Sequence, residues 1–474
     1  MDINSFINIL PILLITLLAL VAILIEAFIK KSESILHWLT VIGTFGIAAY
    51  SLLSIHEQYL NFSGMIHSGG ITHVFYFAFL VTTGMIALVS KNYMTKIQFH
   101  HGEYYLLLML AALGMMVMAS SRDLMLTFLG LELMSVSFYV LAGFNRKKLL
   151  NNEASLKYFL LGAFATGFLL YGIALIYGSA KTTSISTIVG SFPSLLSNVV
   201  FTLGLILFLI GLSFKIAAFP FHMWVPDVYE GSPTTVTAFM STAGKMAAFA
   251  AIIVSLYGST IQPQMFSDLG NILAILSVLS MLFGSIVALA QTNLKRMLAY
   301  SSIAHAGYLL IGIAAANKLG LSGVIYYLIV YAFMNIGAFL IISLFEDSTD
   351  KRIQLDDLAG LVNQKPLIAA FMAMFMFALS GLPPFGGFFG KYYVFVSAID
   401  AGMTWLAVIG VLSSVIAVYF YLRVIIYMYF RETQVYISAN YSFTENFVLV
   451  VSILIVLHMG IFPSTVLDLI TRYL

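Results

Sequence analysis

Long apolar runs dominate this chain and restrict it to one kind of fold. Windows of about 20 apolar residues, long enough to cross the ~30 Å hydrocarbon core of a bilayer, recur along its whole length. Of the residues, 9% are charged and 61% are hydrophobic, whereas a soluble domain carries about 25% charged residues. The pattern predicts an all-α, polytopic membrane protein of about fourteen transmembrane helices. The predicted spans are 6–29, 35–54, 72–90, 104–119, 123–143, 154–178, 197–230, 233–257, 268–290, 297–316, 320–345, 366–399, 402–430 and 443–463.

Two of these spans are too long to be single straight helices. Residues 197–230 and 366–399 each cover roughly 34 residues, or about 51 Å of helix. Prolines lie past the middle of each, namely Pro220 and Pro226 in the first, and Pro383 and Pro384 in the second. Each span is the fourth in a group of five, and because five is odd, one group must lie inverted in the membrane. We therefore expect two inverted five-helix repeats, each containing a broken helix. A simple glycine and proline hinge in GLPPFGGFFG is the alternative.

The repeats divide the chain into four parts. We expect an N-terminal three-helix segment over 1–103, a first five-helix repeat over 104–257, a second, inverted repeat over 258–430 and a C-terminal helix within 431–474. The first apolar run is too long for the core of a signal peptide and is expected to be kept as a span.

Basic residues predict the orientation. Thirteen of the 22 lysines and arginines lie in the loops that follow odd-numbered spans: Lys30, Lys31, Lys91, Lys96, Arg146, Lys147, Lys148, Lys295, Arg296, Lys351, Arg352, Lys365 and Arg431. Four lie in the even loops and the termini, namely Arg122, Lys181, Lys318 and Arg472. By the positive-inside rule the odd loops face the cytoplasm, which puts both termini on the non-cytoplasmic side.

The other five basic residues lie within spans: Lys157, Lys215, Lys245, Lys391 and Arg423. An ammonium at membrane depth costs at least a few kcal/mol, so it most often faces a partner or a hydrated path. Arg423 is near enough to the end of its span to reach the headgroups. Lys157 follows Glu153 by four residues and can simply pair with it. The remaining three lysines are too deep for this and are expected to be functional.

Three further titratable residues accompany these lysines. Glu132 lies near the middle of an unbroken span, where a neighbouring lysine would favour its charged form; a protonated glutamate bonded across a helix interface is the alternative. His305 lies about nine residues into its span and His222 lies between two prolines. Histidine suits proton relay because it titrates near neutral pH, although a packed histidine is also common.

Other chemistry is missing from the sequence. The chain has no cysteine, which excludes disulfides and thiolate-held metal or iron–sulfur sites within it. It has no Walker loop, no dinucleotide-binding glycine motif, no histidine pair with metal-ligand spacing and no basic run suited to nucleic acid. We expect no cofactor, no metal and no nucleic acid, and an energy source that is an ion gradient or a partner subunit.

Five stretches resemble a known family. They are GLELMSVSFYVLAG, EASLKYFLLGAFATGFLLYGIALIYG, FKIAAFPFHMWVPDVYEGSPTTVTAFMSTAGKMAAF, QTNLKRMLAYSSIAHAGYLLIG and LSGLPPFGGFFGKYYVF. Together they are similar to subunit N of the proton-pumping NADH:quinone oxidoreductase, respiratory complex I. The resemblance covers nearly the whole chain. Subunit L carries a long C-terminal lateral helix, whereas this chain stops soon after its fourteenth predicted span, and subunit M typically has a glutamate where this chain has Lys391.

The resemblance implies roles for single residues. Glu132 would pair with Lys215 on the first broken helix, Lys245 would be the central lysine, His305 would lie on the polar axis and Lys391 would be the output-side lysine. A lysine in the position of Lys157 also occurs in the family. The resemblance implies other complex I membrane-arm subunits and the lipid bilayer as partners, the inner membrane of a bacterial cell as location, and protons as the transported species. It places flavin, iron–sulfur clusters and quinone in other subunits.

We therefore expect a subunit that translocates protons while a quinone is reduced elsewhere. A subunit of a related multi-subunit cation/proton antiporter is the alternative from another class. A scaffold that no longer conducts is a third, which the cost of intramembrane charges argues against.

Overall fold

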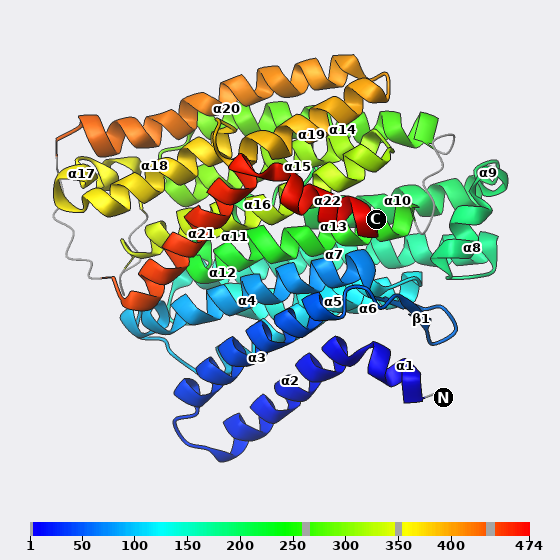
Figure 1. Ribbon diagram of the computed structural model, residues 1–474, viewed down its shortest axis with the longest axis horizontal. Coiled ribbons are helices and arrows are strands. Elements are labelled where there is room, and N and C mark those ends of the chain that lie inside the picture. Colours follow the sequence, from blue (N-terminus) through cyan, green and yellow to red (C-terminus); the bar gives the residue numbers. More distant parts are fainter. Residues whose placement is uncertain (1–2, 258–265, 347–352, 433–440) are drawn as a thin grey trace.

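The computed structural model describes residues 3–257, 266–346, 353–432 and 441–474 (Figure 1). Lys351 and Arg352, which were counted among the odd loops, and residue 258, where the second repeat was expected to begin, lie outside the described residues. Within those residues, thirteen helices are long and apolar enough to cross a membrane, and the broken helix of the second half adds a further segment. The prediction of an all-α, polytopic membrane protein is confirmed.

The helices follow the expected order. The N-terminal part has α1 (Ile3–Asn8), α2 (Leu10–Phe28), α3 (Glu33–Leu53) and α4 (Gly70–Lys96). The first half has α5 (Glu103–Ser120), α6 (Leu124–Ala142), α7 (Leu149–Ala180), α10 (Val199–Ile216), α11 (Val225–Gly231), α12 (Thr234–Phe239), the π-helical η1 (Met240–Gly244) and α13 (Lys245–Tyr257). The second half has α14 (Phe266–Ala290), α15 (Leu294–Ala314), α16 (Lys318–Ser343), α18 (Pro366–Ser380), α19 (Gly386–Asp400) and α20 (Thr404–Phe430). The chain finishes with α21 (Phe443–Ile461) and α22 (Pro463–Tyr473).

Short elements fill some connections, and the sequence did not predict them. A two-stranded antiparallel hairpin, β1 (Tyr59–Asn61) and β2 (Ile66–Ser68), joins α3 to α4. The other short elements are α8 (Ile185–Gly190), α9 (Phe192–Leu195), the 3₁₀ turn η3 (Leu355–Leu358) and α17 (Leu361–Gln364). Helix α22 was also missed, because it is too short and too polar to register as a span.

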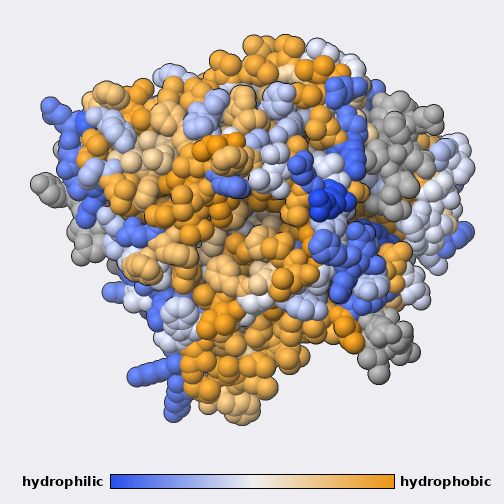
Figure 2. Space-filling view, viewed as in Figure 1, coloured by the Kyte–Doolittle hydropathy of each residue, from blue (hydrophilic) through white to orange (hydrophobic). Residues whose placement is uncertain are grey.

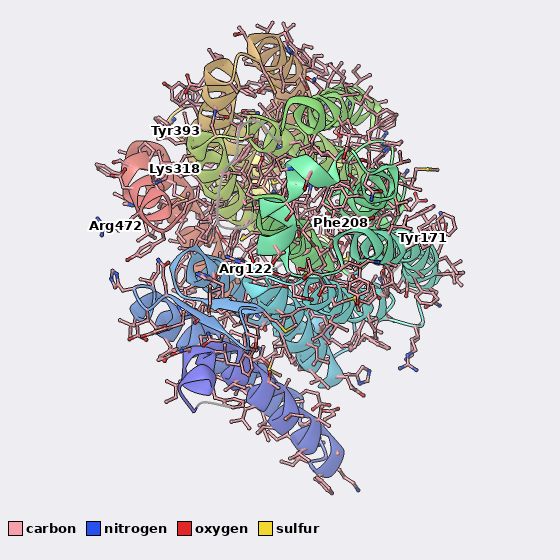
Figure 3. The ribbon with its side chains drawn as sticks, turned by 90° about the vertical axis from the view of Figure 1, so that its right-hand side faces the viewer. Arg122, Tyr171, Phe208, Lys318, Tyr393 and Arg472 are labelled. Atoms are coloured by element: carbon pink, nitrogen blue, oxygen red, sulfur yellow. The ribbon has the colours of Figure 1, made fainter. Side chains whose placement is uncertain are left out.

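Helix α1 and the C-terminus lie at the same end of the bundle, beside the hairpin (Figure 1). Helix α4 runs from the hairpin to the opposite end, where Lys96 donates a hydrogen bond to the Leu344 carbonyl oxygen (2.6 Å). We call these the terminal end and the Lys96 end. Figure 3 looks at the terminal end and shows Arg122, Lys318 and Arg472 there. The sequence had placed these three cations in even loops or the terminus. Which end faces the cytoplasm stays a prediction.

Apolar side chains cover the middle of the molecule. Figure 2 shows hydrophobic residues over the centre of one face and hydrophilic residues gathered toward its two ends, as expected for a bundle that crosses a bilayer. The outer helices leave much of their apolar surface exposed, since 33% of the apolar stretch of α7 is buried and Tyr171 on it points outward (Figure 3). By contrast, 94% of the corresponding stretch is buried in α15, in α16 and in the continuous α12–η1–α13 segment. These three form the core.

The two broken helices end their first halves in the same way. Ala217 closes α10 and Gly381 closes α18, both in the left-handed conformation with φ of 64° and 85°. In each cap two backbone N–H groups donate to carbonyls three and five residues back, which is a Schellman motif. The bonds are Ala217 N to Phe214 O (3.1 Å) and Ala218 N to Ser213 O (2.9 Å), and Gly381 N to Ala378 O and Leu382 N to Phe377 O (both 3.1 Å). A cis X–Pro bond follows at Pro220 and at Pro384.

A second local feature also occurs in both halves. Asp123 caps α6 and forms an isolated β-bridge with Ser184, while Asn293 caps α15 and forms the same bridge with Gln354. The first bridge lies at the terminal end, because the neighbouring Ser121 pairs with β2, and the second lies at the Lys96 end. Helix α10 runs from α9 toward the left of Figure 1 and α18 runs from α17 toward the right, so the halves are inverted. The exact boundaries of the four parts stay predictions.

Candidate functional site: a buried polar axis

Lys215 lies in the last turn of α10, at the break. Its side chain is buried, and Nζ donates to Ser135 Oγ (2.7 Å) and to the Tyr139 hydroxyl (3.1 Å) on α6. The aromatic ring of Tyr139 also lies beneath the ammonium, 5.3 Å from Nζ to the ring centroid. The unpaired carbonyls at the C-terminal end of a helix carry partial negative charge and favour a cation there. The break therefore creates a polar site for one ammonium inside an apolar bundle.

Glu132 lies one turn before Ser135 on α6. It is half-buried and accepts a hydrogen bond from Thr166 on α7 (2.8 Å). The expected direct pairing of Glu132 with Lys215 is not among the ion pairs between described residues, since α6 turns Ser135 toward Lys215 and Glu132 toward α7. Glu132 therefore lies one turn along α6 from Ser135, the residue that contacts Lys215.

Lys245 lies in the core, directly after the π-helical segment η1. Its Nζ donates to both the carbonyl oxygen and the hydroxyl of Ser302 on α15, each at 2.5 Å. The ring of Tyr331 on α16 lies 5.5 Å from Nζ. Single π-turns are rare in helices and occur often at functional sites. Here the π-turn comes directly before Lys245, whose side chain joins the line of buried polar residues that we call the polar axis: Lys245, Ser302, His305, Tyr308 and Lys391.

His305 lies one turn beyond Ser302 on the same helix. Its two ring nitrogens both have hydroxyl partners: Nδ1 is 2.7 Å from Tyr327 Oη and Nε2 is 2.9 Å from Tyr421 Oη. A neutral imidazole donates from one nitrogen and accepts at the other, and a hydroxyl can do either. The His305 imidazole can therefore take a proton from one tyrosine hydroxyl and give a proton to the other by exchanging tautomers.

Lys391 lies on α19, after the second break. Its Nζ donates to the Ser380 carbonyl oxygen (2.7 Å), at the C-terminal end of α18, and to Ser414 Oγ (2.8 Å) on α20. The ring of Tyr308, on α15, lies 5.0 Å from Nζ. The ammonium thus closes the end of the other half-helix.

Helix α15 connects these sites. Ser302, His305 and Tyr308 follow one another at three-residue intervals and cover about 9 Å along the helix axis. Ser302 contacts Lys245, and the ring of Tyr308 faces Lys391. The exposed fractions are 7% for Lys215, 2% for Lys245, 1% for His305 and 5% for Lys391. The structure therefore brings Lys245, His305 and Lys391 together along one buried helix, with Lys215 and Glu132 in the first half.

Comparison with known proteins identifies the family. Residues 121–417, more than half of the chain, match the family model described as NADH:quinone oxidoreductase/Mrp antiporter, TM. The chain is 46% identical over 464 residues to the NADH-quinone oxidoreductase subunit N of Trichlorobacter lovleyi, an alignment that covers 97% of this chain and 95% of that protein. The chain belongs to the NADH-quinone oxidoreductase subunit N family.

Solved structures agree with this assignment. A chain of respiratory complex I from Thermus thermophilus, solved with bound aureothin, is 32% identical, has a TM-score of 0.84, and the match covers 97% of this chain and 99% of that chain. A chain of the Mrp complex from Dietzia sp. has a TM-score of 0.88 at 19% identity over 100% of this chain and 97% of that chain, a likeness that shows the fold alone. The resemblance to subunit N that the sequence indicated is confirmed.

Two residues expected in the site lie away from the axis of this subunit N chain. Lys157 is 41% exposed and forms ion pairs with Glu153 and Asp227 (both 2.6 Å). His222 stacks on Phe219 and lies at a tilt against Phe283, with ring centroids 5.2 and 4.5 Å away, and its buried Nδ1 has no hydrogen-bond partner among the described residues.

Sequence reasoning missed a set of ion pairs at the Lys96 end of the subunit N fold. Arg296 contacts Asp227 (2.7 Å) and Glu230 (2.8 Å), and Lys295 contacts Glu346 (3.1 Å). Lys295 and Arg296 were assigned to a loop, but they occupy the first turn of α15. The three-residue spacing of the two acids in DVYEG, directly after a break, was the available signal. Among the described residues, no group of three or more histidine, aspartate or glutamate side chains could hold a metal ion.

Proposed function

We propose that this chain is a membrane-arm subunit of a proton-translocating NADH:quinone oxidoreductase, and that protons cross it through Glu132, Lys215, Lys245, His305 and Lys391. The observation that carries the proposal is the arrangement along α15, where Lys245 bonds Ser302, His305 follows one turn later and Lys391 faces Tyr308. Titratable groups alternate with hydroxyls there, and proton transfer needs donors and acceptors at hydrogen-bond distance or one water apart.

Charge at one site affects the next because the axis is buried. Two unit charges about 10 Å apart interact by roughly 1.7 kcal/mol at an effective dielectric constant of about 20. That energy changes a protonation equilibrium by more than tenfold. A proton that arrives at one lysine therefore favours release from its neighbour. In this proposal Glu132 acts on Lys215 across one turn of α6, by its charge rather than by contact.

The remaining candidates have lesser roles. Lys157 joins Asp227 at the Lys96 end, where the exposed side chain is within reach of solvent. We leave His222 outside the path, because its neighbours are aromatic rings.

The family also indicates partners and location. The chain is a multi-pass membrane protein of complex I, so its partners include other subunits of that enzyme. We propose that it lies in the inner membrane of a bacterial cell beside other membrane-arm subunits, with the Lys96 end in the cytoplasm and both termini on the other side. Quinone is reduced in other subunits.

The test uses the assembled enzyme in inverted membrane vesicles. Lys245→Ala and Glu132→Ala are each compared with Lys147→Ala, which removes an exposed loop lysine. The measurements are NADH-driven acidification of the vesicle interior, quinone reductase rate and the amount of assembled enzyme. We expect the first two variants to lower acidification several-fold and the control to leave it unchanged. Normal pumping and turnover in both axis variants would count against the proposal.

The alternative is a subunit of a multi-subunit cation/proton antiporter. The likeness to the Mrp complex in fold motivates it, but 46% identity to a subunit N against 19% to that chain favours the first function. Affinity purification of the tagged chain from its own membranes distinguishes the two. NADH dehydrogenase subunits support our proposal, and antiporter subunits support the alternative.

A further inference from the structure

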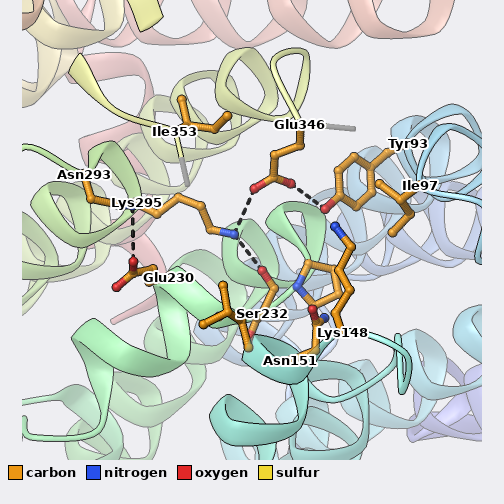
Figure 4. A pocket seen from close by; sticks show the side chains of 13 residues that line it. Tyr93, Ile97, Lys148, Asn151, Glu230, Ser232, Asn293, Lys295, Glu346 and Ile353 are labelled. Carbon is orange, nitrogen blue, oxygen red and sulfur yellow. Dashed lines mark hydrogen bonds and ion pairs between the residues drawn. The ribbon is translucent and has the colours of Figure 1, made fainter. Parts of the chain in front are cut away.

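A small polar cavity lies at the Lys96 end, where α4, α11, α15 and the end of α16 meet. Its volume is about 40 Å³, enough for a few water molecules. Figure 4 shows Lys295 and Glu346 pointing toward one another across it, with Tyr93 on the far side of the carboxylate. Its charged and hydroxyl-bearing lining residues are Tyr93, Lys148, Glu230, Ser232, Lys295 and Glu346.

Glu346 is held from two sides. Lys295 Nζ lies 3.1 Å from its Oε1, and the Tyr93 hydroxyl donates to its Oε2 at 2.6 Å. Lys295 also donates to the Ser232 carbonyl oxygen at 2.7 Å. The side chains of Lys295 and Glu346 are 5% and 15% exposed. Because desolvation offsets the attraction in a buried ion pair, such a pair adds little to stability over a well-packed apolar one. The presence of the Lys295–Glu346 ion pair at this buried position therefore needs an explanation other than stability.

The core helices lead from this cavity to Lys245. On α15, Lys295 is seven residues before Ser302, the partner of Lys245, a distance of about 10 Å along the axis. On α16, which ends just before Glu346, Asn335 and Tyr331 are one turn apart. The ring of Tyr331 lies beside Lys245. The ion pair is thus at the outer end of the same helices that hold the central lysine.

Two buried polar atoms lie between the cavity and the axis without a well-formed hydrogen bond. Tyr331 Oη and Asn335 Oδ1 are buried and make no well-formed hydrogen bond among the described residues, although the Tyr331 hydroxyl is close enough to Ser302 and Asn335 to interact with both. Buried polar atoms are nearly always satisfied, and where no protein group serves, ordered water does. The pair therefore indicates a position for water directly outward of Lys245.

An apolar constriction separates this position from the cavity. Phe339 and Leu340 on α16 pack near Thr234, Thr235 and Ala238 on α12, and the mostly apolar space among them is too small for water in this conformation. In this conformation the route for protons from the Lys96 end is therefore closed between the cavity that contains Glu346 and the polar atoms of Asn335 and Tyr331.

We propose that Glu346 is the first proton-holding site on the route from the Lys96 end to Lys245, with Lys295 as the residue that keeps it charged until a proton arrives. The inference rests on the proposed function and adds an entrance to it. The Glu346 carboxylate takes one proton from a hydronium ion in the cavity, which leaves water. The proton then passes through water near Asn335 to the neutral amine of Lys245, and the carboxylate is restored.

The groups that face Glu346 permit this cycle. Lys295 on α15 and Lys148 at the start of α7 favour the carboxylate, Glu230 on α11 opposes it, and Tyr93 on α4 donates to it. Glu230 is itself bonded to Arg296. When Glu346 becomes neutral, Lys295 keeps its bond to the Ser232 carbonyl, so no ammonium is left without a partner.

The test compares Glu346→Gln with Glu346→Asp in the assembled enzyme. Glutamine keeps the shape and a hydrogen-bond acceptor but holds no proton, whereas aspartate can still titrate. Asp356→Asn is the matched control, because Asp356 is a 61% exposed carboxylate paired with Arg431. Vesicle acidification per NADH oxidised is measured at equal amounts of assembled enzyme. We expect a roughly tenfold fall with glutamine, recovery of most of the activity with aspartate and no change in the control.

Other results are equally informative. Full acidification with Glu346→Gln, or an equal loss with glutamine and aspartate, overturns the inference, because the first needs no titratable group and the second points to a structural role. If Glu346→Gln does not assemble, the charge-neutral double variant Glu346→Gln/Lys295→Gln is measured and interpreted in the same way. Loss of pumping in Lys245→Ala beside normal pumping in Glu346→Gln refutes the entrance alone. Normal pumping in both refutes the proposed function.

Discussion

The ammonium of Lys391 lies 2.7 Å from the carbonyl oxygen of Ser380, so a side chain on one half of a broken helix closes the end of the other half. In the first half of the chain, Lys215 lies in the last turn of α10, but its ammonium donates to Ser135 and Tyr139 on α6 instead of to a carbonyl at the helix end. The two lysines thus lie at equivalent breaks but have different partners. The carbonyls at the C-terminal end of a helix carry partial negative charge, which favours an ammonium at either break.

Replacement of Lys391 should therefore affect both stability and pumping. Lys391→Met removes a proton site and the closer donor of the Ser380 carbonyl, which keeps the longer bond from the Ser414 hydroxyl (3.5 Å); we expect a cost of about 0.5–1.5 kcal/mol. Ser414→Ala removes that longer bond and the second partner of the amine but keeps the amine, so it should cost about as much while pumping persists. Thermal unfolding of the purified enzyme and vesicle acidification measure the two effects. Equal acidification in the two variants would refute a role for the amine in transfer.

Ser302→Ala isolates the contact between Lys245 and α15. The variant removes the hydroxyl but keeps the carbonyl, so Lys245 retains one of its two partners. We expect a loss of about 0.5–1.5 kcal/mol in stability and a larger proportional loss in acidification rate, since the hydroxyl is a step in the transfer. Ser343→Ala is the control, because that buried serine donates only to the Leu340 carbonyl of its own helix. Similar pumping in the two variants would remove Ser302 from the path.

His222 and His305 provide a matched pair of substitutions. His305→Phe deletes both tyrosine contacts and should abolish most of the pumping at normal enzyme levels. His222→Phe places an apolar ring between Phe219 and Phe283 and removes a buried nitrogen without a partner, so pumping and stability should be kept or rise slightly. Acidification assays on both variants decide the matter. A loss with His222→Phe would return that residue to the proton path.

Acid should weaken the contribution of Glu346 to stability. Burial alone would raise the pKa of this carboxyl, but the Lys295 ammonium and the Tyr93 hydroxyl hold the pKa below its ordinary value of 4.5. An acid with a lowered folded-state pKa stabilises the fold above its unfolded pKa, and this stability is lost as the pH falls through the folded value. The melting temperature of the wild-type enzyme should exceed that of Glu346→Gln at neutral pH, and the difference should shrink below about pH 4.5. A constant difference across that range would contradict the lowered pKa.

Much of the fold could be predicted because the bilayer imposes simple rules. Apolar length predicted the spans, and Pro220 and Pro384 marked the broken segments, since a proline in a helix interior removes a backbone hydrogen bond and clashes with the preceding turn. The short elements could not be found in this way. The hairpin before α4 and helix α22 depend on packing at the terminal end rather than on a long apolar run.

The site was harder to predict, because side-chain contacts depend on how each helix is rotated. Sequence spacing placed Glu132 at the right depth for Lys215, but it could not show that Ser135, one turn away, faces the ammonium. For His222, the prolines marked the break but could not reveal that Phe283 of α14 lies against the ring. Glu346 was missed because it follows directly on a long apolar run and looked like the edge of a loop.

The paired β-bridges have a consequence for the buried lysines. The same kind of isolated β-bridge joins Asp123 to Ser184 and Asn293 to Gln354. Because the halves are inverted, one bridge lies at the terminal end and the other at the Lys96 end. Each bridge holds the start of a helix, α6 or α15, against the connecting segment that contains Ser184 or Gln354. The helices that start at these bridges carry the partners of two buried lysines, since Ser135 on α6 contacts Lys215 and Ser302 on α15 contacts Lys245.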